Sequence, residues 1–282
     1  MISISDKTEI LIEALPYIQE YEEKTFVIKY GGAAMVDEDL KETFAQDVTL
    51  LKKIGVRIVI VHGGGKEITD LANKLGLPTR FVDGQRYTDA EMMDVVKMVL
   101  GGKTNQEIVA RINQHDGGAV GLSGVDNGLL LVHKHMQGGK DLGLVGEMLR
   151  VNTAFLDLLF THEIMPVIAP IGVDSGGQVY NVNADMVAGF VAAALQAEKL
   201  VYLSDVPGVL VNDELLHSLD RARAASLVDE GTVSGGMLPK IRSAFSALDA
   251  GVNKVHLIDG RVKHSLLLEI FTKEGVGTEV IH

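Results

Sequence analysis

Residues 57–75 read RIVIVHGGGKEITDLANKL, and this stretch decides the fold. Its first five residues, 57–61, are mostly β-branched and apolar, which predicts a buried strand. Three glycines follow His62, and a helical segment then runs to about Leu75. A short apolar strand that ends in a glycine turn before a helix is typical of a parallel sheet covered by helices.

The same pattern recurs on both sides of this stretch. Upstream, residues 25–30 (TFVIKY) end at Gly31 and Gly32, before a helical segment that runs to about Lys53. Further strands are predicted downstream at 119–122, 129–132, 166–171, 200–204 and 254–258, with alanine-rich helical segments before the last two. We therefore expect an α/β fold, an open αβα sandwich with a mainly parallel central sheet. The turn-rich segment 173–180 predicts a boundary near residue 180, between lobes 23–180 and 181–282.

Residues 1–22 stand apart as a helix that precedes the first strand. Asp6 with Glu9 is typical of a helix cap. Apolar residues then recur at helical spacing, namely Ile10, Leu11, Ala14, Leu15, Ile18 and Tyr21. Pro16 lies among them and is expected to kink or divide the helix. The apolar face either packs on its own domain or is offered to another subunit as an oligomerisation helix.

Composition excludes several classes of protein. The net charge of −12 argues against a nucleic-acid binder, and the lack of cysteine rules out disulfides and thiolate zinc sites. No run approaches the roughly 20 apolar residues of a membrane span. Residues 1–9 do not have the basic and apolar regions of a signal peptide, so we expect a cytoplasmic protein. Glycine is abundant, at 31 of 282 residues, and its clusters are places where backbone can approach a ligand.

Neither of the common nucleotide-binding loops is present. Gly102, Lys103 and Thr104 resemble the end of a P-loop, but Lys97 stands where the first glycine is required. No G-x-G-x-x-G sequence opens a helix after a strand. If the protein binds a nucleotide, it uses a different kind of binding loop.

Two strand ends could hold an anion through backbone N–H groups. Lys29 ends the first strand, and Gly31 and Gly32 follow it, although a strand-end lysine beside an ordinary turn would look the same. The three glycines after His62 expose a helix N-terminus without side chains. A merely structural turn would rarely need three. We interpret His62 itself as a hydrogen-bonded residue and assign it no acid–base role.

Other polar segments are weaker one by one. Arg86 could hold a carboxylate in a bidentate manner, or be a surface residue. Asn181, Asn183 and Asp185 could cap a helix or orient a substrate. The loop after the strand 200–204, and the lysine Lys240 after Gly235 and Gly236, complete the set. Together these groups offer positive charge and N–H dipoles to several negative oxygens, which is what phosphoryl transfer requires.

These segments, in this order, resemble the amino acid kinase family across essentially the whole chain. The matching stretches are 29–32, 62–65, 84–88, 181–185, 204–210 and 235–240. Within the family, the resemblance is greatest to kinases that phosphorylate the γ-carboxylate of N-acetyl-L-glutamate with ATP in arginine biosynthesis. It implies that the N-terminal lobe binds the acylated amino acid and the C-terminal lobe binds ATP.

The resemblance also implies roles for individual residues. Lys29 and Lys240 would stabilise the transition state, and Asp185 would hold both lysines in position. Gly32 and Gly64 would donate N–H groups to the transferring phosphoryl group, while Gly64, Gly65, Arg86 and Asn181 would bind the substrate, Arg86 on its α-carboxylate. The nucleotide contacts would come from Asp205, Val206, Pro207, Gly208, Val209, Leu210, Thr232, Val233 and Ser234.

The implied reaction is in-line attack of the γ-carboxylate on the γ-phosphate, which gives an acyl phosphate and ADP. A carboxylate is already ionised at pH 7, so no general base is required. Mg²⁺ would accompany ATP, held mainly by phosphate oxygens and water. No protein metal site and no tightly bound cofactor are expected.

The resemblance further implies feedback inhibition by L-arginine. Arginine-sensitive kinases of this type share an N-terminal helix, which interlaces neighbouring dimers into a hexamer, and a C-terminal stretch like residues 264–278. The arginine site would be lined by Tyr21, Lys199, Glu269, Gly275 and Gly277, with Glu269 on the guanidinium. The alternative is that residues 266–270 are plain core and Glu269 is a surface acid.

Two other functions are compatible with the pattern. A related kinase acts on aminoadipate or glutamate attached to an acidic carrier protein, but a net charge of −12 disfavours such a partner. A non-catalytic sensor of amino acids or nucleotides could use the same fold. It would have no use for paired lysines that stabilise a transition state.

Overall fold

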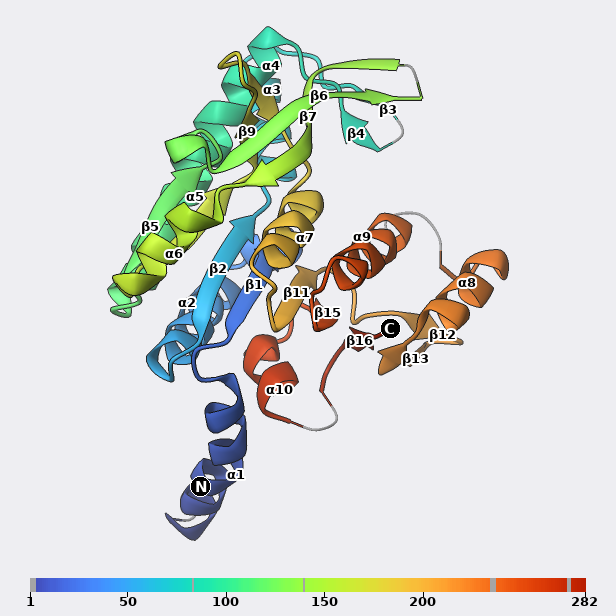
Figure 1. Ribbon diagram of the computed structural model, residues 1–282. Coiled ribbons are helices and arrows are strands. Elements are labelled where there is room, and N and C mark those ends of the chain that lie inside the picture. The colour runs from blue at the N-terminus through green and yellow to red at the C-terminus, as the bar shows by residue number, and fades with distance from the viewer. Residues whose placement is uncertain (1–3, 83, 139, 234–236, 273–274) are drawn as a thin grey trace.

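The computed structural model describes residues 4–82, 84–138, 140–233, 237–272 and 275–282 (Figure 1). Its central sheet has eight strands in the order β14-β16-β15-β11-β1-β2-β8-β5. All neighbours in this sheet are parallel except β15 and β16. The bounds in that order are Ser218–Leu219, Thr278–Val280, Lys254–Asp259, Lys199–Ser204, Thr25–Tyr30, Arg57–His62, Met165–Ala169 and Ala119–Ser123. The predicted α/β fold with a mainly parallel sheet is confirmed.

Helices bury both faces of this sheet, as near-continuous apolar strands require. One face packs against α2 (Glu38–Lys53), α5 (Asn105–Gln114) and α10 (Ser265–Phe271). The opposite face packs against α6 (Thr153–Thr161), α7 (Ala184–Ala194) and α9 (Met237–Asp249). Successive residues of one strand alternate between the two cores, because Phe26 and Ile28 belong to the first core and Val27 to the second.

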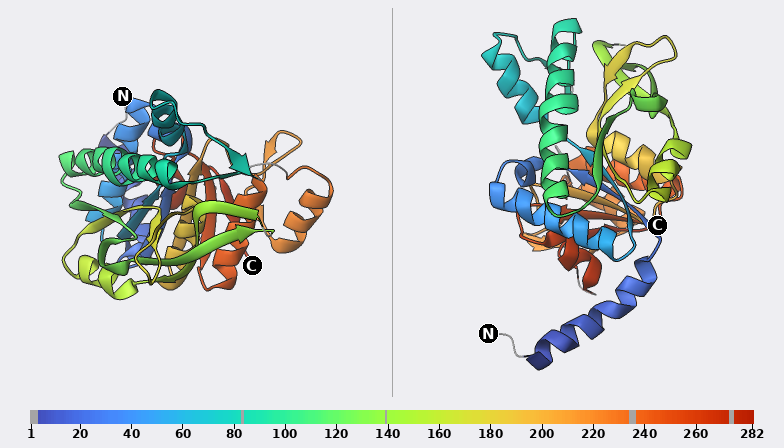
Figure 2. Two further views of the ribbon diagram at one scale, coloured as in Figure 1. Left: turned by 90° about the horizontal axis from the view of Figure 1, so that it is seen from above. Right: turned by 90° about the vertical axis from the view of Figure 1, so that its left-hand side faces the viewer.

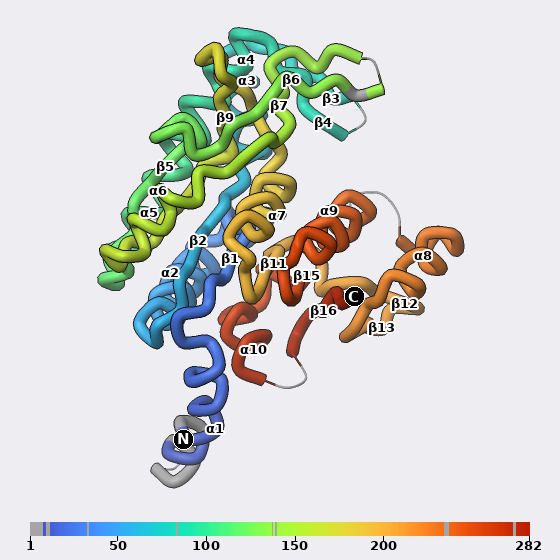
Figure 3. Tube along the Cα trace, in the orientation of Figure 1, coloured from blue at the N-terminus to red at the C-terminus, as the bar shows by residue number. Residues whose placement is uncertain are grey.

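A small barrel of four strands lies beside the sheet, at the end of the molecule away from α1 (Figure 3). It consists of β6 (Leu130–Gln137), β7 (Lys140–Val151), β9 (Ile171–Val173) and β10 (Val179–Asn181). The strand predicted at 129–132 therefore exists, but it pairs with β7 and β9 and not with the main sheet. Alternation along one strand carries no information about its partners, which explains the difference.

Several shorter elements complete the chain. The helical ones are η1 (Gly32–Met35), α3 (Gly65–Lys74), α4 (Ala90–Val96), the π-helix η2 (Lys97–Thr104), η3 (Asp126–Gly128) and α8 (Arg221–Asp229). Two short hairpins pair β3 (Phe81–Val82) with β4 (Gln85–Arg86) and β12 (Leu210–Val211) with β13 (Glu214–Leu215). Within the ranges that the structure describes, no helix has the length and apolar character needed to cross a membrane.

The N-terminal helix α1 (Ile4–Tyr21) projects away from the rest of the molecule (Figure 2). It runs through Pro16 as one helix, so, of the two predicted effects of this proline, division is wrong, while a kink stays a prediction. Its last turns contact the body, where Tyr17 packs edge-on against Phe271 and Tyr21 is buried. Ile12 and Leu15 are 64% and 45% exposed, so the apolar side of α1 is not covered by its own domain. The side chains of Asp6, Ile10 and Leu11 lie outside the described residues.

Candidate active site

The polar segments identified in the sequence meet at the carboxyl edge of the central strands. Lys29 lies at the end of β1, the glycines 63–65 follow β2, and Asp205 follows β11. These three strands are adjacent and parallel, so the loops after them converge on one edge of the sheet. In open α/β sheets this edge is the usual place for a ligand.

Two lysines meet on one carboxylate at this edge. Lys29 Nζ lies 3.2 Å from Asp185 Oδ1, and Lys240 Nζ donates to Asp185 Oδ2 at 2.9 Å. The three side chains are only 11–19% exposed. Burial acts to raise the pKa of Asp185, but the two ammonium groups outweigh it and hold that pKa below its ordinary value. The carboxyl group is therefore ionised at neutral pH and neutralises one of the two positive charges.

The first turn of α7 is held firmly, which places Asp185. Asn183 caps this helix through its side-chain oxygen, which accepts from the N–H groups of Asp185 and Met186. The carbonyl of Asp185 faces the hydroxyls of Tyr202 and Ser243 at 3.4 and 3.3 Å, and these two hydroxyls are 2.8 Å apart. Sequence reasoning missed Tyr202 and Ser243. Tyr202 lies in the apolar strand LVYLS, and a tyrosine in such a strand indicates that its hydroxyl has a buried hydrogen-bond partner.

A side chain would be crowded at the two glycine turns that follow β1 and β2. A Cβ atom at Gly31 would collide with the Lys29 amine, and one at Gly32, where φ is +71°, would collide with the Asp205 carboxylate. A Cβ atom at Gly64 would collide with Leu100. Helix α3 begins at Gly65 with no side-chain cap, so its first N–H groups are open to a ligand.

A cavity of about 230 Å³ lies against this helix start, lined by the glycines 63–65, Arg86 and Asn181 among others. Arg86 uses one guanidinium nitrogen to donate to Gly65 O and Thr69 Oγ1, both at 2.8 Å. Its other terminal nitrogen, Nη1, is buried and has no partner among the described residues. Burial lowers the pKa of Arg86 from its ordinary value, but guanidinium stays charged at neutral pH. The free nitrogen is therefore ready for an anionic ligand.

Asn181 lies across the same cavity and donates from Nδ2 to Thr88 Oγ1 at 3.2 Å. The carbonyl oxygen of its amide has no partner among the described residues. Both residues predicted to bind the substrate through side chains, Arg86 and Asn181, thus line one cavity.

The predicted nucleotide loop follows β11 and packs on β16. The Val209 N–H donates to Thr278 Oγ1 at 2.8 Å, and the Val209 side chain is buried in the core. Val206 and Leu210 are each 38% exposed. After α8, Thr232 is exposed and Val233 is buried, while Ser234, Gly235 and Gly236 lie outside the described residues. Val209 and Val233 are buried, so only their backbone groups could contact a nucleotide.

A second polar cluster lies where α1 meets the sheet, far from Asp185. Lys199 Nζ lies 5.1 Å from the centre of the Tyr21 ring and 3.2 Å from His256 Nε2. His256 Nδ1 is 2.7 Å from Glu269 Oε1. Sequence reasoning missed His256, which joins Lys199 to Glu269. It is the polar residue within the otherwise apolar run VHLI.

Glu269 is buried, so the alternative that it is a surface acid is wrong. Its Oε2 accepts from the N–H groups of Val276 and Gly277 at 2.6 and 2.9 Å. A side chain at Gly275 would collide with the same carboxylate. Burial acts to raise the pKa of Glu269, but these N–H groups and His256 hold it below its ordinary value. The five residues predicted for the arginine site therefore lie close together.

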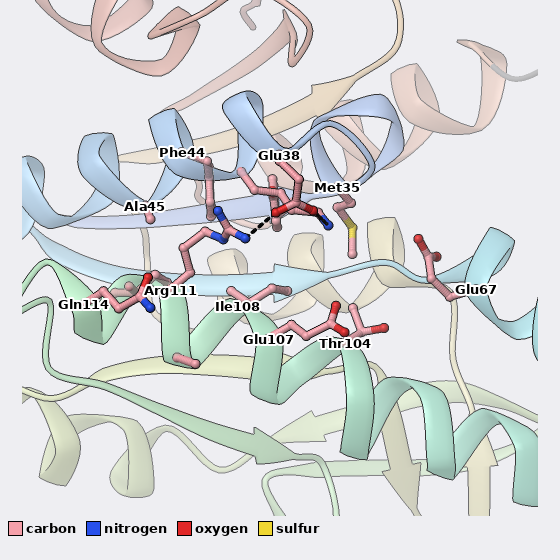
Figure 4. A pocket seen from close by; sticks show the side chains of 14 residues that line it. Met35, Glu38, Phe44, Ala45, Glu67, Thr104, Glu107, Ile108, Arg111 and Gln114 are labelled. Carbon is pink, nitrogen blue, oxygen red and sulfur yellow. Dashed lines mark hydrogen bonds and ion pairs between the residues drawn. The ribbon is translucent and has the colours of Figure 1, made fainter.

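A larger cavity, of about 390 Å³, lies between α2 and α5, and none of the residues predicted for a site lines it (Figure 4). Glu38 is held there between Lys41 at 2.7 Å and Arg111 at 2.5 Å, so its charge is already compensated. Within the described ranges, no group of three or more histidine or acidic residues could hold a metal ion. The residues predicted to bind the substrate line the smaller cavity instead.

Comparison with known proteins gives a consistent set of relatives. The sequence model described as "Amino acid kinase family" matches residues 24–259. The chain is 57% identical to acetylglutamate kinase of Chlorobium chlorochromatii (strain CaD3), over 97% of this chain and 96% of that protein. It is 52% identical to acetylglutamate kinase of Geotalea uraniireducens (strain Rf4), with both chains covered in full.

Among solved structures, N-acetylglutamate synthase from Neisseria gonorrhoeae, complexed with coenzyme A and N-acetyl-glutamate, superposes with a TM-score of 0.88 at 28% sequence identity. That match covers 98% of this chain and 63% of the synthase chain. The remaining part of the synthase has no counterpart in the present sequence.

Proposed function

The chain belongs to the amino acid kinase family, and from this we propose that it transfers the γ-phosphoryl group of ATP to the γ-carboxylate of N-acetyl-L-glutamate. The products are N-acetyl-L-glutamyl 5-phosphate and ADP. One observation carries the proposal: Lys29 and Lys240 converge on Asp185 beside the open start of α3. High identity to two acetylglutamate kinases over nearly their full lengths supports the choice of substrate.

The reaction is an in-line displacement at the γ-phosphorus. An oxygen of the substrate γ-carboxylate forms the new P–O bond while the bond to the bridging oxygen of ADP breaks. Lys29 and Lys240 neutralise the negative charge that develops on the phosphoryl oxygens, and Asp185 keeps the two ammonium groups at a fixed separation. The N–H groups of Gly32 and Gly64 supply further dipoles. The attacking carboxylate is ionised at neutral pH, so no side chain has to remove a proton.

The two lobes divide the binding of the substrates. Residues 23–180, with Asn181 at the start of the second lobe, hold N-acetyl-L-glutamate in the cavity of about 230 Å³, where Arg86 Nη1 meets the α-carboxylate and Asn181 orients the rest of the molecule. Residues 181–282 hold ATP through the loop from Asp205 to Leu210 and the segment 232–234. Mg²⁺ enters with ATP and neutralises its phosphate oxygens, which together with water provide the oxygen ligands that this ion prefers.

The direct test is ATP-dependent formation of the acyl phosphate, trapped with hydroxylamine as a hydroxamate. We expect product with N-acetyl-L-glutamate and none with glutarate or N-acetyl-L-aspartate at the same concentration. If the enzyme instead phosphorylated aminoadipate attached to a carrier protein, and not N-acetyl-L-glutamate, the related kinase activity would be the correct assignment. Binding of both ligands without any product would instead favour a sensor.

Arg86→Lys is expected to raise the KM for N-acetyl-L-glutamate by about 10- to 100-fold, since hydrogen bonds to charged groups contribute about 1.5–3 kcal/mol. Lysine cannot bond Gly65 O, Thr69 Oγ1 and a carboxylate with the geometry of a guanidinium. The KM for ATP should stay within about threefold, because Arg86 serves the other substrate. Steady-state kinetics measure both constants.

Arg80→Lys is the matched control for that variant. The guanidinium carbon of Arg86 lies 4.8 Å from the centre of the Phe81 ring, and that of Arg80 lies 4.4 Å from the centre of the Tyr87 ring. Arg80, however, is exposed and does not line the cavity. Equal KM values for Arg86→Lys and Arg80→Lys would remove Arg86 from the substrate site.

We also propose that L-arginine inhibits the enzyme by binding at the cluster of Tyr21, Lys199, Glu269, Gly275 and Gly277. The buried Glu269 carboxylate provides the partner that a guanidinium requires, at the joint between α1 and the sheet.

The exposed Ile12 and Leu15 on the projecting helix support an interface with another copy, and we propose a hexamer built from three dimers. Sedimentation of the full chain distinguishes a hexamer from a dimer.

Glu269→Gln is expected to raise the arginine concentration for half-inhibition by about 10- to 100-fold, since the neutral amide loses a charge-assisted pair with the guanidinium. Inhibition is expressed relative to the activity of each variant without arginine, so any change in basal turnover cancels. Glu214→Gln, on the exposed hairpin of β12 and β13, serves as the control. Unchanged sensitivity in Glu269→Gln would place the arginine site elsewhere.

A further inference from the structure

His62 is fully buried at the end of β2, and both of its ring nitrogens have partners. Nδ1 lies 2.8 Å from the carbonyl oxygen of Gly63, the next residue. Nε2 lies 3.1 Å from Asn105 Nδ2. That amide also donates to the carbonyl of Val167 at 2.9 Å, and Asn105 is itself buried.

These partners determine where the proton of the ring lies. The Val167 carbonyl can only accept, so it must face the NH₂ group of Asn105 rather than the amide oxygen. The same NH₂ group faces Nε2, which must therefore accept and carry no proton. Nδ1 then carries the proton and donates it to the Gly63 carbonyl. Burial lowers the pKa of His62 to about 4, which agrees with a neutral ring at pH 7.

The bond to the Gly63 carbonyl also determines where the next N–H group points. The C=O of Gly63 and the N–H of Gly64 belong to one planar trans peptide unit, so they point in opposite directions. With the carbonyl turned toward the buried ring of His62, the Gly64 N–H is turned away from it. The glycines 63–65 line the substrate cavity.

Among the described residues, no other hydrogen bond holds this peptide unit. The Gly63 N–H donates to Tyr30 O at 2.8 Å and the Gly64 carbonyl accepts from Ile68 N at 3.0 Å, but both groups belong to the neighbouring peptide units. Glycine on either side gives the unit little steric preference for one orientation. The imidazole therefore provides the restraint that the three-glycine sequence lacks.

We propose that His62 is a positioning residue for phosphoryl transfer: by donating from Nδ1 to the Gly63 carbonyl, with Asn105 enforcing that tautomer, it keeps the Gly64 N–H aimed at the transferring phosphoryl group. This inference rests on the function proposed above. It gives His62 no contact with either substrate and no exchange of protons with them.

Two amide variants separate this role from a general packing role. In His62→Asn, the side-chain NH₂ group can occupy the place of Nδ1 and still donate to the Gly63 carbonyl. In His62→Gln, the amide reaches the place of Nε2 and leaves that carbonyl without a donor. Both variants put one amide into the same buried position, so a merely structural role would impair both alike.

We expect His62→Gln to lower kcat about 100-fold, the usual effect of losing one oriented oxyanion donor, and His62→Asn to lower it by no more than about tenfold. The KM for N-acetyl-L-glutamate should stay within about threefold in both variants, since Arg86 and Asn181 are intact. Melting temperatures are measured alongside. Equal losses of kcat that follow the loss of melting temperature would overturn the proposal.

The tautomer is tested on the unmodified protein, without any assay of activity. Long-range ¹H–¹⁵N correlation spectra distinguish a ring protonated at Nδ1 from one protonated at Nε2, and comparison with His62→Asn identifies the signals of this residue. We expect a neutral ring protonated at Nδ1 at pH 7. A proton on Nε2, or a charged ring, would overturn the inference even if the kinase activity is found. Absence of acyl phosphate from the wild type, with the expected tautomer, would instead contradict the proposed reaction.

Discussion

Lys29→Ala is expected to lower kcat for acyl phosphate formation about 1,000-fold. This is at the upper end of the effect of removing one oriented hydrogen-bond donor, and within the range for removing a charged group that stabilises phosphoryl transfer. The lysine projects from the end of β1 to within 3.2 Å of Asp185, beside the glycines that would face the phosphoryl group. Its ammonium group is needed most when negative charge spreads over the phosphoryl oxygens, so the loss falls on kcat. The KM for N-acetyl-L-glutamate should change less than tenfold, because the contacts that we propose for that substrate are with Arg86 and Asn181.

Lys24→Ala is the control for this variant. Lys24 lies just before the same strand and is exposed, so removing its charge leaves the site intact. Both variants are assayed for hydroxamate formation at saturating ATP. A Lys29→Ala enzyme within tenfold of the wild-type kcat would exclude Lys29 from the stabilisation of the transition state.

Asp185→Asn is expected to lower kcat about 100-fold, because the loss of this partner misplaces two charged groups that each act on the transition state. Asparagine has nearly the same shape as aspartate but is neutral, and part of its amide is a donor that would face an ammonium group. Lys29 and Lys240 would then repel each other without a carboxylate between them. Measured kcat values test this directly.

The combination Lys29→Ala with Asp185→Asn tests whether these residues act as one unit. If they do, the double variant loses much less activity than the product of the two single losses. Losses that multiply fully would mean that Asp185 does not act through Lys29. Asp70→Asn, an exposed acid on α3, is the control for the loss of one negative charge.

The depressed pKa of Asp185 adds a dependence of stability on pH. Its carboxylate is favoured in the folded state, so the stabilisation is fully present above the ordinary pKa of 3.8 and is lost as pH falls through the lower folded value. The melting temperature of the wild type should therefore exceed that of Asp185→Asn by a constant amount above about pH 5. This difference should shrink as the pH falls toward 3. A difference independent of pH would mean that the charge of Asp185 does not contribute.

Some contacts around the candidate site could not be predicted from sequence. The hydroxyls of Tyr202 and Ser243 face the Asp185 carbonyl, and the Asn105 amide faces the His62 ring. None of these three residues belongs to a recognisable motif. His256 likewise joins Lys199 to Glu269 only because β11 and β15 are neighbours in the sheet. A polar residue in an apolar strand indicates that it has a partner, but the sequence does not say which one.

The small barrel and helix α1 illustrate the same limit. The sequence predicts a strand near residue 130, yet its alternation cannot reveal that this strand pairs with β7 and β9 and not with the main sheet. Pro16 lies within α1, which continues through it as one helix. Local rules describe what a residue prefers, and the rest of the structure can override that preference.

The α/β class, the parallel central sheet and the sheet edge proposed to bind the substrates all follow from the sequence alone. Apolar runs that end in glycine turns specify strands followed by helices, and all parallel strands end at the same edge. Three features depend on the tertiary structure: Lys29 and Lys240 meet on Asp185, the His62 ring lies against the Gly63 carbonyl, and Arg86 Nη1 has no hydrogen-bond partner among the described residues. These contacts depend on the lateral order of the strands and on how the helices pack against them. That order minimises the free energy of the whole chain, and no local segment encodes it.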